Sequence, residues 1–308
     1  KPSRPPIEGV EHGMTSDEFL RNHNLPQSMA MVGGGYIAVE FASVLNEFGV
    51  DVTIFQRPDH LIKEHDHDMS EALEERLEEK GIDVHTGTEV QKIEKVERTY
   101  RLNVDRDGEE GRFGADRVLV AAGREPNTDE LGLENLDLKL DHGFVPVDNF
   151  MRTEIDGVFA VGDITGEQHF TPVAIAEGKV AGDNAVTETD TTVDYRAIPS
   201  AVFTTPEVGT VGLTESEARK QYDQVQPARK TFRPFSAAVR REPGETTVKL
   251  VYAGSEDQLV GLHVLGPHAS EIVQGFALAM RQGVSMDDLR DFPGVHPTIA
   301  EEVFSTKP

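Results

Sequence analysis

A glycine-rich segment between an apolar run and a helical pattern constrains the fold more than any other feature. The apolar run is Met29–Val32, glycines follow at 33–35, and Tyr36–Phe48 has helical periodicity with Gly49 as its expected cap. A second apolar run, Val50–Phe55, comes directly afterwards. This order predicts a strand, a tight turn, a helix and a parallel strand, as at the start of a Rossmann-like α/β domain.

The turn carries the residue types that a bound dinucleotide requires. Gly33 permits the tight turn, Gly35 lets the backbone approach a pyrophosphate, and Ala38 is small enough for close helix–strand packing. Tyr36 and Ile37 begin a helix whose free N–H groups and partial positive charge favour phosphate. The pattern favours a nicotinamide dinucleotide site in an oxidoreductase. The alternative is a glycine-rich turn in an ordinary α/β domain.

The residues after the second apolar run bear on which nicotinamide cofactor is bound. An acidic residue there would bind a ribose 2′-hydroxyl and repel a 2′-phosphate. The chain instead has Gln56 and Arg57, with Lys63 six residues beyond Arg57. Two cations suit a 2′-phosphate and therefore favour NADPH. The alternative is that both are solvated surface cations of an acidic protein.

Further patterns complete this first domain. A charged amphipathic helix is expected over Asp68–Lys80, alternating strands through Asp105, a turn at Asp107 and Gly108, and an apolar strand over Val118–Gly123. The pattern predicts one βαβ domain with an inserted β-meander.

Two more regions follow. From about Arg124 to Asp194 we expect a strand over Gly157–Asp163 and a helix from about Pro172 to Thr187. An α+β region begins near Tyr195. Its expected elements are strands within residues 200–203, 246–252 and 258–266, and a helix over Ser270–Gln282.

Charge and hydropathy exclude two classes of partner. Acidic residues outnumber basic ones 55 to 30, the net charge is −25, and no basic cluster is present, so no nucleic acid is expected. The spread of the charge favours a protein of a halophilic cytoplasm, with an ordinary soluble acidic protein as the alternative. No apolar run could span a bilayer and no signal peptide begins the chain, so we expect no membrane partner and a cytoplasmic location.

The chain contains no cysteine, which excludes a cysteine nucleophile, a disulfide or a thiolate metal site within it. The acidic and histidine-rich run Glu64–Asp68 is interpreted as a solvated loop, and no metal is expected. The G-x-S-x-G pattern of many serine hydrolases is absent as well.

His296 precedes Glu301 by five residues in HPTIAEE. A carboxylate bonded to one imidazole nitrogen fixes the tautomer and raises the basicity of the ring, as in a general acid–base pair. The alternative is a capping box with Thr298 as N-cap and Glu301 at the third helical position, and the two are compatible. A second isolated signal is Asp163, a carboxylate at an expected strand end that could accept hydrogen bonds from a cofactor.

Taken together, the motifs resemble the flavoprotein disulfide reductases, the class I pyridine nucleotide–disulfide oxidoreductases, and within them the glutathione reductases. The resemblance covers nearly the whole chain in family order. It is carried by SRPPIEG, HGMTSDEF, GGGYIAVEFA, AAGREPNT, GVFAVGDIT, FTPVAIAEG, FTTPEVGTVGLTE, GLHVLGPHASEIVQGFALAMRQG and HPTIAEE.

The resemblance implies an NAD(P)-binding domain at 28–123, inserted in a partial FAD-binding domain. Residues 1–27 would be a linker or remnant of that FAD domain, residues 124–194 its C-terminal part, and residues 195–308 an α+β domain that forms a homodimer. The implied cofactors are FAD and NADPH. The implied partner is the disulfide of a small thiol, either glutathione disulfide or bis-γ-glutamylcystine.

The resemblance also assigns roles residue by residue. Tyr36 would cover the flavin until nicotinamide displaces it, Glu40 would lie near the flavin, and Asp163 would bind the ribityl chain. His296, oriented by Glu301, would protonate the departing thiolate in the partner subunit's active site. The positions implied to contact NADPH or FAD are Gly33, Gly35, Tyr36, Ile37, Ala38, Glu40, Arg57, Lys63, Gly123, Arg124, Gly162, Asp163, Thr171, Pro172, Val173 and Ala174.

The chain departs from the family pattern in one respect. The family begins with an FAD-binding GxGxxG segment and a CxxxxC redox pair, and neither occurs here. We therefore expect this chain alone not to reduce a disulfide. Three alternatives remain open: a dihydrolipoamide dehydrogenase-like or mercuric reductase-like enzyme, a truncated, non-catalytic dimeric module that binds nucleotide, and an NADH-dependent flavoprotein without disulfide chemistry.

Overall fold

The computed structural model describes residues 1–187, 190–240 and 244–308. The chain forms two compact units. The large unit contains residues 4–123 and 196–308, and the small unit contains residues 1–3 and 124–195. The large unit has a parallel Rossmann-like sheet followed by an α+β region, which confirms the predicted α/β class.

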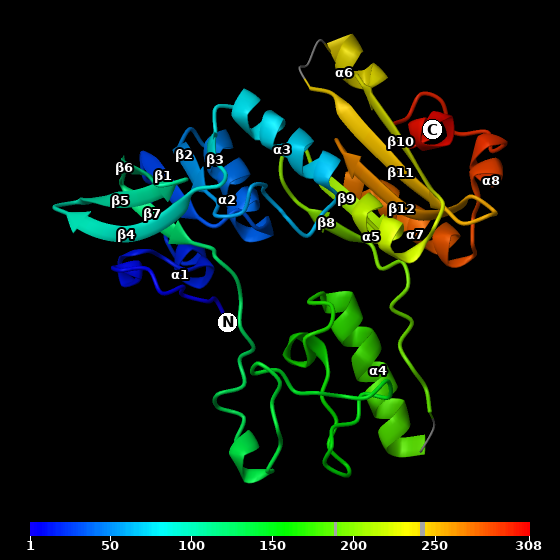
Figure 1. The fold of residues 1–308 in the computed structure, drawn as a ribbon, viewed down its shortest axis with the longest axis horizontal. Coiled ribbons are helices and arrows are strands. Elements are labelled where there is room, and N and C mark those ends of the chain that lie inside the picture. The colour runs from blue at the N-terminus through cyan, green and yellow to red at the C-terminus, as the bar shows by residue number, and fades with distance from the viewer. Residues whose placement is uncertain (188–189, 241–243) are drawn as a thin grey trace. The chain divides into compact units, whose positions relative to one another are not determined.

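The first half of the large unit is organised around a parallel sheet of four strands in the order β3-β2-β1-β7 (Figure 1). Ser28 of β1 pairs with Asp51 of β2, and Val32 pairs with Phe55. The elements of this sheet and its helices are β1 (Ser28–Val32), α2 (Tyr36–Glu47), β2 (Asp51–Phe55), α3 (His67–Glu79), β3 (Asp83–His85) and β7 (Arg117–Val120). The predicted strand–turn–helix–strand order is confirmed.

β1 is apolar along its length because both of its faces are covered. Met29 and Met31 lie in the core that also contains α2 and α3 side chains. Ala30 and Val32 lie in a second core, formed with residues of the antiparallel meander. A strand covered on both faces has a nearly continuous apolar sequence, as this one does.

The inserted meander is a three-stranded antiparallel sheet, β4-β5-β6, as predicted. Its strands are β4 (Glu89–Val96), β5 (Thr99–Arg106) and β6 (Glu109–Ala115). Asp107 and Gly108 connect β5 to β6 with φ values of 54° and 86°. Two successive left-handed residues match the twist of a hairpin, which explains the Asp-Gly pair. Two short helices, η1 (Val10–His12) and α1 (Ser16–Leu20), precede β1.

The second half of the large unit is a five-stranded sheet in the order β10-β11-β12-β9-β8, with antiparallel neighbours (Figure 1). Its elements are β8 (Ser200–Val202), β9 (Val208–Gly212), α5 (Glu215–Gln221), β10 (Val225–Phe232), α6 (Phe235–Arg240), β11 (Thr246–Ala253), β12 (Gln258–Leu265), α7 (Ala269–Arg281), α8 (Met286–Arg290) and α9 (Glu301–Ser305). α7 packs against β9 and β12 and contributes Val273 and Ala277 to the core.

The two halves of the large unit share a hydrophobic core. Val202, Val208 and Leu265 belong to the same buried cluster as Leu73 and Leu77 of α3. α3 also packs against β12. The first half of the large unit, residues 4–123, and the C-terminal half, residues 196–308, are therefore joined by packing as well as by the chain.

The small unit contains the helix α4 (Thr171–Thr187), which confirms the predicted helix, and two 3₁₀ helices, η2 (Leu133–Asn135) and η3 (Gly162–Thr165). The predicted strand over Gly157–Asp163 is wrong. Only Phe159 forms a β-bridge, with Arg152, and the chain then turns into η3. An apolar run of this kind needs neighbouring strands to form a ladder, and the described residues of the small unit contain no regular strand beside it.

Among the described residues, no helix is both long enough and apolar enough to cross a membrane.

Candidate nucleotide-binding and catalytic sites

The glycine turn after β1 is required by close backbone packing. Gly33 has φ = 112° and donates its N–H to the carbonyl of Phe55 at 2.9 Å. A Cβ at this position would lie 2.4 Å from the carbonyl oxygen of Ala121 on the neighbouring chain segment. At Gly34, a Cβ would lie 2.5 Å from the Leu61 side chain. A larger residue at Gly33 would displace the turn, and one at Gly34 would displace the Leu61 side chain.

Gly35, unlike Gly33 and Gly34, has open space beside it. A Cβ there would meet no atom within 4 Å, and the residue forms the N-cap of α2 without a side-chain hydrogen bond. The first hydrogen bond of α2 runs from the Val39 N–H to the Gly35 carbonyl, at 3.2 Å. The N–H groups of the residues that precede Val39 in the first turn therefore have no partner within the helix. These donors and the open space beside Gly35 fit a dinucleotide pyrophosphate. Ala38 is fully buried under the turn, which explains the need for a small residue.

Replacing Gly35 with Val is expected to lower the affinity of the chain for NADPH by at least about tenfold, because the side chain fills the space left for the pyrophosphate. The backbone of Gly35 is extended, with φ = −77° and ψ = 178°, so the fold should tolerate Val. Quenching of intrinsic tyrosine fluorescence on titration with NADPH would measure the dissociation constant. Gly275→Ala, also in open space but on α7, is the control. Equal affinities for Gly35→Val and wild type would contradict the prediction.

Gln56 has a structural role in this turn. Its side chain is buried, its Oε1 accepts the Gly34 N–H at 2.9 Å, and its Nε2 donates to the His60 carbonyl at 3.2 Å. The amide therefore connects the glycine turn to the loop that follows β2. The sequence interpretation treated Gln56 only as a neutral side chain near a 2′-phosphate.

Arg57 and Lys63 lie on that same loop and are exposed. Their side chains are 78% and 63% accessible, and each faces one surface carboxylate, Glu89 at 3.8 Å and Glu64 at 3.4 Å. Exposed pairs at such distances contribute little free energy. Both cations can therefore exchange these partners for a phosphate.

Glu40 lies on α2 one helical turn after the half-exposed Tyr36, so both side chains lie on the same face of the helix. Its Oε1 accepts the Phe203 N–H at 2.8 Å. Burial raises the pKa of the Glu40 carboxyl, and the hydrogen bond from Phe203 offsets only part of that rise.

His296 and Glu301 form the predicted pair. The imidazole Nδ1 lies 3.0 Å from each carboxylate oxygen of Glu301. Since a carboxylate accepts, Nδ1 carries the proton there. Nε2 has no hydrogen-bond partner among the described residues, and the His296 side chain is 80% exposed. The ring is thus oriented on one side and open on the other.

The capping-box contacts are present as well, and they orient the carboxylate. Glu301 accepts the Thr298 N–H at 3.1 Å, while its own N–H donates to the Thr298 hydroxyl at 3.2 Å. The assigned helix begins only at Glu301. Gly294 allows the preceding loop to approach, because a Cβ there would lie 2.9 Å from the Cβ of Glu301.

The interpretation of Glu64–Asp68 as a solvated loop is wrong at Asp66, although Glu64 and His67 are exposed. Asp66 is 1% exposed and accepts hydrogen bonds from Lys249 at 2.8 Å and from the Glu215 N–H at 3.0 Å. The burial of Asp66 could not be predicted from the alternating acids and histidines, because neighbouring residues in the sequence do not distinguish a buried acid from a solvated one. The usable signal was Lys249, a lone cation within the apolar strand pattern TTVKLVY.

His67, Asp68 and Glu71 have potential metal ligands within 4.8 Å of one another. The carboxylate of Asp68, however, is bonded to Lys249 at 2.9 Å and faces Arg229 at 3.6 Å. These contacts identify Asp68 as a partner of cations from the protein itself.

In the small unit, Asp163 on η3 is exposed. The preceding Gly162 donates its N–H to the Glu177 carboxylate at 2.6 Å, and a Cβ on Gly162 would lie 3.3 Å from the Cβ of Ala174. Glu177, which sequence reasoning did not identify, is 1% exposed and also accepts the Tyr195 hydroxyl at 2.8 Å. An exposed carboxylate held beside a packed helix fits a polyol chain such as ribityl.

Tyr195, the start of α4 and the junction at Gly123 and Arg124 hold the remaining predicted positions. Burial, together with the hydrogen bond to Glu177, raises the pKa of the Tyr195 hydroxyl. α4 begins at Thr171, where Thr171 and Pro172 are exposed and Val173 is buried. Gly123, with φ = 133°, is the last residue of this stretch of the large unit, and the exposed Arg124 is the first of the small unit.

Two protein-family models match the chain. Residues 1–178 match the model described as pyridine nucleotide-disulphide oxidoreductase, and residues 198–306 match the dimerisation domain of the same family. The chain belongs to the pyridine nucleotide-disulphide oxidoreductase family. Enzymes of this family are FAD-dependent and act on sulfur groups, and the glutathione reductase-like members use FAD and NADPH.

Several members of the family are similar along nearly the whole chain. The glutathione reductase of Burkholderia cepacia is 37% identical over 303 residues, which are 98% of this chain and 67% of the relative. The dihydrolipoyl dehydrogenase 2 of Haloarcula marismortui is 36% identical over 295 residues, which cover 95% and 62% of the two chains. The chain thus spans about two thirds of the length of these relatives.

A solved structure shows the same fold. It is the Cu(II) complex of a variant of the HOCl-induced flavoprotein disulfide reductase from Escherichia coli, with a TM-score of 0.89 and 26% sequence identity. The match covers 99% of this chain and 69% of the solved one.

Proposed function

We propose that the chain is part of an NADPH-dependent flavoprotein disulfide reductase whose substrate is the disulfide of a small thiol. The observation that carries the proposal is the turn before α2, which is open at Gly35 and is followed by two exposed cations, Arg57 and Lys63. Family membership supports the sulfur chemistry, and three of the relatives described as glutathione reductases are 34–37% identical to this chain.

Bound NADPH and FAD would supply the reducing equivalents for this reaction. The donors at the start of α2 would hold the pyrophosphate of NADPH, and Arg57 and Lys63 its 2′-phosphate. Asp163 and the start of α4 would hold parts of FAD. His296 would keep a proton on Nε2 for the departing thiolate, while Glu301 stabilises the protonated ring through Nδ1.

The proposal assigns a role to each segment. Residues 28–123 would bind NADPH, residues 1–27 and 124–194 would belong to an FAD-binding domain, and residues 195–308 would form the homodimer. A match to the family's dimerisation domain over residues 198–306 supports the last assignment. We place the enzyme in the cytoplasm of a halophile, where concentrated salt would screen a net charge of −25.

The redox disulfide of such a reaction cannot come from these residues, because the 308 residues contain no cysteine. We therefore propose that polypeptide outside them supplies it. The isolated chain should not reduce a disulfide with NADPH.

The substrate assignment is glutathione disulfide or bis-γ-glutamylcystine. A dihydrolipoamide dehydrogenase-like activity is the second candidate, favoured by the 36% identity to the Haloarcula marismortui relative. Turnover of each disulfide by an enzyme that includes this chain, FAD and a redox cysteine pair would separate these candidates. A non-catalytic nucleotide-binding module would bind NADPH and reduce none of them.

Cofactor preference tests the carrying observation directly. The chain is expected to bind NADPH at least about tenfold more tightly than NADH, since two cations can each form a charge-assisted contact with the 2′-phosphate. Arg57→Gln and Lys63→Gln should each reduce this ratio and leave the NADH dissociation constant nearly unchanged. Lys95→Gln, which removes an exposed cation from β4, is the control. Tighter binding of NADH than NADPH by the wild-type chain would contradict the proposal.

A further inference from the structure

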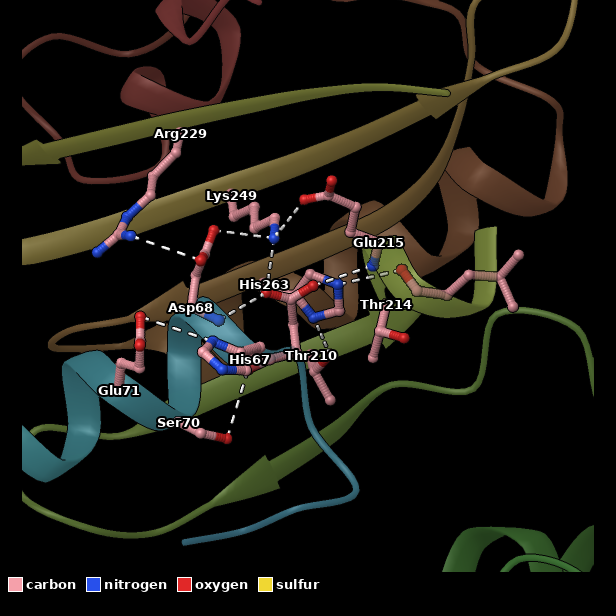
Figure 2. A network of polar contacts seen from close by, with 12 residues as sticks. His67, Asp68, Ser70, Glu71, Thr210, Thr214, Glu215, Arg229, Lys249 and His263 are labelled. Atoms are coloured by element: carbon pink, nitrogen blue, oxygen red, sulfur yellow. Dashed lines mark hydrogen bonds and ion pairs between the residues drawn. The ribbon is translucent and has the colours of Figure 1, made fainter. Parts of the chain in front are cut away.

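A buried cation on the C-terminal sheet binds three carboxylates. The side chain of Lys249, on β11, is only 3% exposed. Its Nζ lies 2.8 Å from Asp66. It also lies 2.9 Å from Asp68 and 2.9 Å from Glu215, and Figure 2 shows both carboxylates pointing toward Lys249. Asp66 and Asp68 belong to the nucleotide-binding half of the large unit, whereas Lys249 and Glu215 belong to the C-terminal half.

The cluster is charged. Burial alone would raise the pKa of Asp66, but the hydrogen bonds from Lys249 and from the Glu215 N–H lower it overall. Burial would likewise lower the pKa of Lys249, and its three carboxylate partners raise it instead. Both groups are therefore ionised at neutral pH, and the pair fixes its two backbones with charge-assisted bonds.

Asp66 is the last residue before α3 and the end of the loop that follows β2. As N-cap, its Oδ1 also accepts the Asp68 N–H at 3.1 Å. The other end of the loop is held by Gln56, which binds Gly34 in the nucleotide turn. The loop that carries Arg57 and Lys63 is thus held at one end by Gln56, within the same half of the large unit. At the other end it is held by Lys249 of the C-terminal half.

Between these anchors the backbone is strained at Ile62. Its φ of 38° lies in the left-handed region, which β-branched residues rarely adopt. The Ile62 N–H donates to the Gly34 carbonyl at 2.8 Å, and its carbonyl accepts the His65 N–H at 2.8 Å. Such strain persists only where the surroundings hold it, and Asp66 immediately follows this turn. The conformation of Ile62 sets the direction of the next residue, Lys63.

We propose that Lys249 is a positioning residue for the nucleotide site: by holding Asp66, it maintains the strained Ile62 turn that directs Lys63 toward the 2′-phosphate. Preference for NADPH is then set partly by the C-terminal half of the chain. This inference rests on the proposed function, because it assumes that Lys63 contacts the nucleotide.

A purely cohesive role explains the cluster less well. The two halves already share the core that contains Val202, Val208 and Leu265. A second ion pair, Arg76 to Glu245 at 3.2 Å, joins α3 to the C-terminal half near the other end of the helix. A buried ion pair also adds little net stability compared with apolar residues of similar volume. The distinctive property of the Lys249 cluster is its position at the end of the loop that carries Arg57 and Lys63.

The test compares dissociation constants of NADPH and NADH for the chain carrying Lys249→Met, Asp66→Asn or Glu245→Gln. Lys249→Met and Asp66→Asn should weaken NADPH binding about tenfold and change NADH binding less than about threefold. Glu245→Gln removes the ion pair near the far end of α3 and should change neither constant. In Lys249→Met, the added substitution Lys63→Gln should have no further effect on NADPH binding.

Two further outcomes are decisive. A wild-type ratio of NADPH to NADH affinity in a folded Lys249→Met or Asp66→Asn chain would overturn the proposal, whether both affinities are unchanged or both fall by the same factor. If Lys249→Met does not fold, Asp66→Asn carries the test, because its amide oxygen can still cap α3. A wild-type chain without preference for NADPH, or one whose NADPH affinity is unaffected by Lys63→Gln, would instead refute the proposed function, so the two failures are distinguishable.

Discussion

Replacing His296 with Ala, in an enzyme that contains this chain together with FAD and a redox cysteine pair, is expected to lower disulfide turnover by roughly 10²–10⁴-fold. The imidazole is held by Glu301 at 3.0 Å through Nδ1, and its Nε2 is open to a substrate. Loss of this proton donor should affect the step in which a thiolate departs. Reduction of the flavin by NADPH, followed by stopped-flow absorbance, should keep its wild-type rate.

Two variants make this prediction specific. Glu301→Gln retains an acceptor for the Thr298 N–H but loses the charge that stabilises a protonated ring, so it should give a smaller loss of turnover than His296→Ala. His142→Ala, which removes a side chain that is 93% exposed in the small unit, should have no effect. Equal loss of both half-reactions in His296→Ala would show that the residue has a structural role instead.

Acidification from pH 6.5 to pH 4 is expected to destabilise the large unit, with His263 alone contributing on the order of 3 kcal/mol. Burial lowers the pKa of His263 from 6.5 to about 4, although the charge of Asp66 opposes this shift. Below pH 6.5 His263 binds a proton in the unfolded chain, whereas in the folded chain it stays neutral until about pH 4. Stability is therefore complete above pH 6.5 and is lost as the pH falls through this window.

The geometry explains why His263 stays neutral. The ring is fully buried on β12, its Nε2 lies 3.1 Å from the Leu213 carbonyl, and its Nδ1 bonds to the Thr210 hydroxyl. A neutral imidazole has one donor and one acceptor nitrogen, and these two contacts satisfy both. A charged ring at the same place would carry the additional free-energy cost of removing its charge from water. His65 acts in the same direction, because burial lowers its pKa too.

Urea unfolding at pH 7.0, 5.5 and 4.5 would measure this dependence. In His263→Gln, the decrease in unfolding free energy between pH 7.0 and 4.5 should be smaller than in the wild type by about 2–3 kcal/mol. The comparison uses the slope with pH, so any uniform destabilisation by the substitution cancels. His142→Gln is the matched control on the surface. Identical slopes for wild type and His263→Gln would rule out His263 as the source.

Elements with a complete local pattern could be predicted from the sequence, and those with interrupted patterns could not. β1, α2, β2, α3 and α7 were predicted close to their observed bounds. β9 was missed because VGTVG contains two glycines, and β10 because Pro227 and two cations, Arg229 and Lys230, interrupt its pattern. β10 is an edge strand, where a proline is tolerated.

Local spacing determined much of the candidate site. Gly33 is required by close approach of the backbone at Ala121, and Gly35 leaves open space before α2. His296 meets Glu301 because the capping contacts between Thr298 and Glu301 hold the carboxylate in place. In both cases the partners are close in sequence, or the requirement concerns the backbone alone. Residue type and spacing are then sufficient to predict the contact.

Tertiary structure alone decided which charged groups are buried. Asp66 and Lys249 are separated by 183 residues, and the same run of acids and histidines would be solvated if the C-terminal sheet did not cover it. Glu177 likewise acquires its role only when α4 packs beside Gly162. Burial changes the energy of a charge far more than any neighbour in sequence does, and burial is set by packing between distant segments.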